Sequence, residues 1–126
     1  MLLVFLYISR EIIFRYEILV DQRFLYLYNY SDRHESYIFL FSVIVLVAIY
    51  EEVIFRGMVQ HWLTNKVGSI VAILITSVLF GWMHGDYELF GMTMGIAFGF
   101  IYHLKRSLSA AILLHMLWNL ISSFSM

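Results

Sequence analysis

The composition of this 126-residue chain excludes an ordinary water-exposed globule, because 62% of its residues are apolar and only 13% are charged, against about 25% charged in soluble domains. Much of the surface is therefore expected to face lipid. The balance of 8 basic and 9 acidic residues offers no electrostatic basis for binding nucleic acid, and the lack of cysteine excludes disulfides, thiolate metal sites and a cysteine nucleophile.

Residues 1–36 are predicted to form a segment of their own. Between Ile12 and Leu27, apolar residues recur at a spacing of about 3.6 and charged residues fall on the opposite face. This pattern predicts an amphipathic N-terminal helix. The helix either lies in the membrane interface or packs its apolar stripe on the rest of the chain, and the stretch 29–36 is expected to be a loop.

The remainder of the chain, 37–126, contains long apolar stretches of a length close to the ~17–25 residues that a helix needs to cross a membrane. They cover 37–63, 67–83, 89–104 and 108–124. The breaks between them are short and polar, at 64–66, 85–88 and 105–107, and short connections make successive helices antiparallel neighbours. The predicted fold is all-α, a polytopic membrane bundle of about four transmembrane helices preceded by the amphipathic helix.

Ionisable side chains at membrane depth cost roughly 2.5–3.5 kcal/mol each, so those in the first apolar stretch are informative. Glu52 and Arg56 stand at i and i+4 with the acid first, the favourable order for an ion pair. Glu51 is rotated by about 100° from Glu52 and is left without that partner, which suits a general base. The alternative is that both acids serve one structural ion-pair network.

Further polar residues occur in the second and fourth stretches. His84 ends the second stretch one turn after Phe80, and His115 and Asn119 share one face of the fourth. With antiparallel helices rising about 1.5 Å per residue, Glu51 and these three polar residues fall within about 14 Å of depth. Their convergence in one cavity is therefore allowed.

Two other features favour structural roles. Gly91, Gly95 and Gly99 repeat every four residues, and a stripe of small residues lets another helix approach closely. His103 falls near the far end of the third stretch and is interpreted as a membrane-boundary residue. His61 and His34 are interpreted as boundary or loop residues.

A carboxylate, two imidazoles and an amide in one cavity are typical of a hydrolytic site. In one arrangement Glu51 and His84 activate a water, and His115 and Asn119 donate hydrogen bonds to the developing oxyanion. In the other, Glu51, His84 and His115 bind a divalent metal such as zinc.

The same residues resemble the motifs of the CPBP family, the CAAX protease and bacteriocin-processing (Abi) membrane proteins. Glu51–Gly57 resembles its EExxxR motif, Phe80–His84 its FxxxH motif and His115–Asn119 its HxxxN motif. The resemblance covers about 37–122. It implies an intramembrane endopeptidase of the glutamate type, in which Glu51 and His84 activate water.

The resemblance also assigns the remaining roles. His115 and Asn119 become the oxyanion stabilisers, and Glu52, Arg56 and Phe80 support them. No cofactor is expected, with a divalent metal as the minor alternative. The expected partners are a membrane-associated peptide or protein substrate and the lipid bilayer, without nucleic acid, and a homo-oligomer is left open. The expected location is a bacterial plasma membrane.

Two other classes of function stay open at this stage. One is a non-catalytic membrane protein that confers self-immunity to a bacteriocin, a role to which bacterial relatives of the resembled family are linked. The other is a membrane scaffold whose polar residues only lock the helices together. Replacing Glu51 by glutamine separates both from an enzyme, because only the enzyme loses its function with the base.

Overall fold

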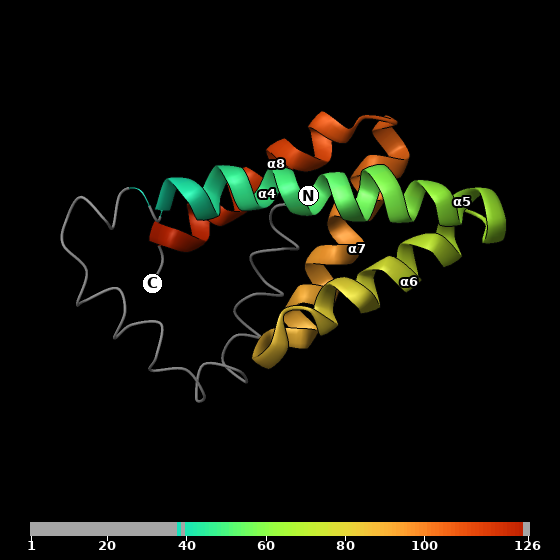
Figure 1. Cartoon of the computed structure of the whole chain (residues 1–126), viewed down its shortest axis with the longest axis horizontal. Coiled ribbons are helices and arrows are strands. Elements are labelled where there is room, and N and C mark those ends of the chain that lie inside the picture. The colour runs from blue at the N-terminus through green and yellow to red at the C-terminus, as the bar shows by residue number, and fades with distance from the viewer. Residues whose placement is uncertain (1–37, 39, 125–126) are drawn as a thin grey trace.

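The computed structural model describes residue 38 and residues 40–124, and every secondary-structure element in that part of the chain is helical (Figure 1). The prediction of an all-α chain is confirmed for these residues. The amphipathic helix predicted within 1–36 lies outside them. The elements follow one another as η1 (Ser42–Val47), α4 (Ala48–Glu52), η2 (Val53–Gln60), α5 (His61–Val67), α6 (Ser69–Trp82), η3 (Gly85–Tyr87), α7 (Glu88–Lys105) and α8 (Leu108–Phe124).

The first four elements form one continuous helix, hereafter the first helix. The backbone keeps right-handed helical angles at each junction, at Val47, Glu52 and Gln60. The segments η1 and η2 are π-helical, with each turn widened by one residue relative to an α-helix. The sequence pattern predicts an ordinary helix here. The two π-helical segments lie before and after the short α-helical segment that carries Glu51 and Glu52.

The turns between helices follow the predicted breaks with one correction. The stretch 64–66 is still helical, and the chain reverses at Gly68. Gly68 has φ 84° and ψ 162°, angles that only glycine adopts without a steric penalty. The polar residues before it therefore complete the last turn of α5, and the backbone freedom of Gly68 decides where the helix ends.

Helices α6 and α7 share the most extensive interface in the described part of the chain. The glycine stripe of α7 lies at this interface: a Cβ added to Gly95 would stand 2.8 Å from the Cα of Ser77. No side chain fits in that space, so the backbones of α6 and α7 approach as closely as the stripe predicts. Gly91 meets α6 in the same way, beside Gly81 and His84.

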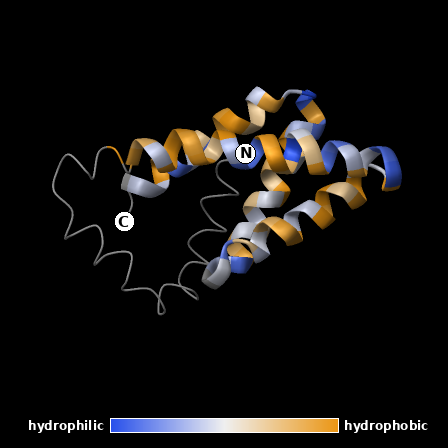
Figure 2. Cartoon of the chain, viewed as in Figure 1, coloured by the Kyte–Doolittle hydropathy of each residue, from blue (hydrophilic) through white to orange (hydrophobic). Residues whose placement is uncertain are grey.

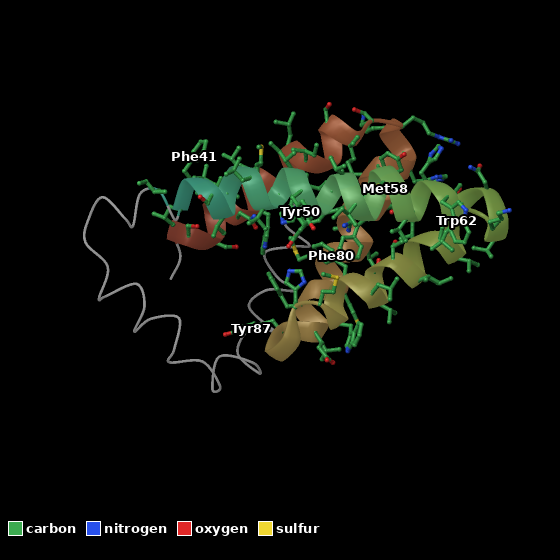
Figure 3. All side chains as sticks on the ribbon, in the orientation of Figure 1. Phe41, Tyr50, Met58, Trp62, Phe80 and Tyr87 are labelled. Carbon is green, nitrogen blue, oxygen red and sulfur yellow. The ribbon has the colours of Figure 1, made fainter. Side chains whose placement is uncertain are left out.

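The core lies between the α6–α7 pair, the first helix and α8. Its buried members are Phe55, Phe80, Met94, Ala97, Phe98 and Trp118. Figure 3 shows Phe80 between the first helix and α6. Many large apolar side chains are also exposed on the helices, and Figure 2 shows hydrophobic residues recurring along each of the long helices. Among the described residues no helix combines the length and apolar character needed to cross a membrane, whereas the sequence predicts about four such helices.

Candidate active site

The centre of the site is a buried chain of charged groups that joins the first helix to α8. Arg56 Nε lies 3.1 Å from Glu52 Oε2, and both side chains are fully buried. The predicted i,i+4 pair is therefore present. The other carboxylate oxygen of Glu52 lies 2.9 Å from Nδ1 of His115. Glu52 thus links the arginine of its own helix to the histidine of another.

Aromatic rings and a glycine carbonyl surround the guanidinium of Arg56. Arg56 Nη2 donates a hydrogen bond to the carbonyl of Gly95, at 2.9 Å. Its Cζ lies 4.7 Å from the ring centre of Phe80 and 5.5 Å from that of Phe98, distances at which a ring face attracts a cation. A buried charge needs such compensation, and Gly95 contributes to it through its backbone carbonyl.

Two contacts hold the ring of His115, one at Nδ1 and one on a face of the ring. A carboxylate only accepts hydrogen bonds, so the Nδ1–H of His115 donates to Glu52. Phe98 stacks on the imidazole with 4.5 Å between ring centres and 22° between planes. The orientation directs Nε2 toward Glu51, whose Oε2 is 3.7 Å away. This separation exceeds a direct hydrogen bond.

Glu51 is the acid that remains outside the buried pair. Its side chain is 24% exposed, whereas that of Glu52 is fully buried. His115 and His84 both lie close enough to interact electrostatically with Glu51. The two adjacent glutamates therefore occupy different environments, one inside the ion-pair network and one at its open edge beside two imidazoles.

His84 follows the end of α6 and is held by the turn before it. Its Nδ1 lies 2.6 Å from the carbonyl oxygen of Phe80, and its ring centre is 4.5 Å from the Phe80 ring. A carbonyl only accepts, so Nδ1 carries a proton, and Nε2 is the ring nitrogen left for another partner. Phe80 also lies within 6.0 Å of the His115 ring, centre to centre. Phe80 thus separates and orients the two histidines.

Asn119 is placed one turn further along α8 than His115. Its side-chain NH₂ donates to the carbonyl of Val43, at 3.0 Å, which leaves the second N–H of that group for another acceptor. The bond ties α8 to the start of the first helix. No side-chain hydrogen bond joins Asn119 to Glu51, His84 or His115 among the described residues.

The described structure therefore brings six of the predicted residues into one cluster and holds the seventh, Asn119, nearby on α8. The cluster consists of Glu51, Glu52, Arg56, Phe80, His84 and His115. The sequence reasoning missed Phe98, which touches both Arg56 and His115. The only signal for it in the sequence is its position beside Gly99 in the glycine stripe.

The alternative of a divalent metal held by Glu51, His84 and His115 stays a prediction. Among the described residues no group of three or more histidine, cysteine, aspartate or glutamate side chains is arranged to hold a metal. His84 directs Nδ1 to a backbone carbonyl and His115 directs Nδ1 to Glu52, so Nε2 is the ring nitrogen that each keeps for another partner.

Comparison with known proteins identifies relatives of the segment that carries the site. The family model described as type II CAAX prenyl endopeptidase Rce1-like matches residues 33–121. Relatives are "Putative membrane peptidase YdiL" of Bacillus subtilis, 36% identical over 73 residues, and "Membrane-embedded CAAX protease MroQ" of Staphylococcus aureus, 32% identical over 92 residues. A third is "UPF0177 protein YaiH" of Lactococcus lactis, 30% identical over 81 residues.

These matches cover 56%, 65% and 62% of this chain but only 30%, 36% and 33% of the respective relatives. The chain thus spans about a third of the length of the curated relatives that it matches. No solved structure gives a significant match.

Proposed function

This chain belongs to the Rce1-like family of type II CAAX prenyl endopeptidases, and from this membership and the geometry of the site we propose that it is a membrane-embedded endopeptidase. One observation carries the proposal. Glu51 is the carboxylate left out of the buried Glu52–Arg56 pair, it is partly exposed, and it faces Nε2 of His115 at 3.7 Å. A positioned carboxylate of this kind can act as a general base.

In the proposed mechanism Glu51 takes a proton from a water molecule whose other hydrogen is held by Nε2 of His84. The hydroxide attacks the carbonyl carbon of the peptide bond, and the proton on Glu51 passes to the leaving amine. In this proposal His115 is an imidazolium from the start, with its Nδ1–H on Glu52. Its Nε2–H and the free N–H of Asn119 donate to the oxyanion. Donors that are fixed before the reaction stabilise this charge without reorganising.

Glu52, Arg56 and Phe98 act as positioning residues in this proposal. Glu52 holds Nδ1 of His115, Arg56 balances the charge of Glu52, and Phe98 fixes the plane of the imidazole. We propose a prenylated peptide with a C-terminal CAAX sequence as the first substrate class to test, because the matching family model is described by that substrate. The proposed location is a bacterial plasma membrane, in line with the bacterial relatives.

The experiment reconstitutes the full chain in proteoliposomes and follows cleavage of a fluorogenic farnesylated CAAX peptide. Glu51→Gln keeps the shape of the side chain and removes the base, so kcat should fall by about 10²–10⁴. The matched control is Glu88→Gln, the same change at an exposed acid of α7 outside the site. Cleavage that persists in Glu51→Gln would refute the mechanism, and a wild-type chain that leaves this peptide intact would refute the CAAX-type substrate.

A further inference from the structure

A polar cleft lies where the C-terminal parts of the first helix and α7 meet, away from the cluster of acids and imidazoles. Its volume is about 230 Å³, below the ~300–1,000 Å³ of pockets for drug-sized ligands. It therefore fits a small chemical group. All its lining residues are polar or charged: Gln60, His61, Thr64, Tyr102, His103 and Arg106. Figure 3 shows Trp62, the neighbour of His61 in the chain, at this end of the first helix.

The lining side chains offer hydrogen-bond donors and no carboxylate. The Tyr102 hydroxyl and Nδ1 of His61 are 3.5 Å apart across the cleft. Thr64, His103 and Arg106 make no side-chain hydrogen bond or ion pair with any other described residue. Gln60 is the buried floor, and its side-chain NH₂ donates to the carbonyl of Gly99 at 3.0 Å. Thr64, His103 and Arg106 thus carry donors that lack an acceptor among the described residues, which suits an anion. The buried Oε1 of Gln60 is an unpaired acceptor beneath them.

The distribution of basic and acidic residues also favours an anion in the cleft. Apart from Arg56, every lysine and arginine of the described residues lies at this end of the bundle, at Lys66, Lys105 and Arg106. The acids of that part of the chain lie elsewhere in the sequence, at 51, 52, 86 and 88. Figure 2 shows hydrophilic residues at the end of α5 and in the turn between α7 and α8. The resulting positive field favours an anion at this end.

Arg106 also stands in a backbone conformation that its side chain does not favour. Its φ is 51°, in the left-handed region, and its N–H closes the end of α7 with a bond of 2.9 Å to the carbonyl of Tyr102. Glycine is the preferred residue at such a helix end. The helix end would form at least as well with glycine at this position, so the turn does not require the guanidinium of Arg106. This points to a role of the guanidinium in the cleft.

We propose that this cleft binds a phosphate group, supplied either by the headgroup of an anionic phospholipid or by a soluble phosphate. The guanidinium of Arg106 pairs with the phosphate oxygens, and the hydroxyls of Thr64 and Tyr102 donate to them. Arginine and phosphate form paired, charge-assisted hydrogen bonds. For a membrane peptidase such a site would fix one end of the bundle at the headgroup level of the bilayer.

The test titrates the purified full chain in detergent, by calorimetry, with short-chain dihexanoyl phosphatidylglycerol and separately with inorganic phosphate. The decisive variant is Arg106→Gly, which suits the left-handed backbone and should melt no lower than wild type. Its affinity should fall at least about fivefold, the effect of one basic residue on an anionic lipid. Lys105→Gln is the matched control, because it removes the same charge from an exposed neighbour that does not line the cleft.

Each outcome has a defined meaning. Binding of both probes that weakens in Arg106→Gly and not in Lys105→Gln shows that the phosphate group itself is recognised. Binding of the lipid alone, with the same dependence on Arg106, identifies a phospholipid headgroup as the source. Absence of binding, or an equal loss in Arg106→Gly and Lys105→Gln, would overturn the proposal, because the attraction would then be absent or merely diffuse.

Discussion

Replacing Glu51 or Glu52 by glutamine should affect the protein in different ways. The change at Glu52 should lower its stability, and the change at Glu51 should lower its activity. Glu52 is fully buried and is shared by Arg56 and His115, whereas the side chain of Glu51 is 24% exposed and has only a contact of 3.7 Å with His115. Removing one partner of a buried ion pair costs about 3–5 kcal/mol, because the other charge is left uncompensated. A partly exposed pair contributes about 0–1 kcal/mol.

Glu52→Gln should therefore destabilise the protein by about 3 kcal/mol or more, and Glu51→Gln by less than about 1 kcal/mol. For a chain of this length, about 1 kcal/mol corresponds to roughly 3–5 °C in Tm. The two variants should then differ by about 10 °C. Glu51→Gln should still lose its activity, because it removes the proposed general base.

The assay is thermal unfolding in detergent, followed by circular dichroism at the helical band. A double variant, Glu52→Gln with Arg56→Met, serves as the control because it removes both buried charges. It should melt at or above the temperature of Glu52→Gln alone. Equal losses in Glu51→Gln and Glu52→Gln would refute the reasoning, because both acids would then belong to one structural network and the base assignment would rest on family membership alone.

The glycine stripe and the ring stacked on His115 give further predictions. Gly95→Ala would place a Cβ 2.8 Å from the Cα of Ser77 and should cost about 1–3 kcal/mol in chemical unfolding. Gly57→Ala, whose Cβ has its nearest neighbour in the Leu108 side chain at 3.5 Å, should be neutral or slightly stabilising. Equal effects of the two substitutions would contradict the close approach of α6 and α7. Phe98→Leu should lower kcat more than it raises KM, because it frees the imidazole; unchanged kcat would remove Phe98 from the positioning residues.

The apolar and polar pattern of the sequence predicted the described helices correctly but not the position of every helix end. The long apolar runs and their polar breaks predict the number and order of the described helices, because apolar side chains must cover each helix on most of its faces. The end of α5 was misplaced by a few residues, since Gly68 and not the polar residues before it permits the turn. The π-helical turns around Glu51 and Glu52 leave no mark in the spacing of the residues.

The sequence by itself determined which polar residues occur in apolar surroundings and that Glu52 and Arg56 can pair, because an i,i+4 relation is a property of one helix. Only the tertiary structure decided that Glu52 also holds His115, that Phe98 stacks on that ring, and that the NH₂ of Asn119 bonds to Val43. Those contacts join residues on different helices. Their existence depends on how α8 packs against the first helix and α7, and the spacing of residues along one helix does not contain that information.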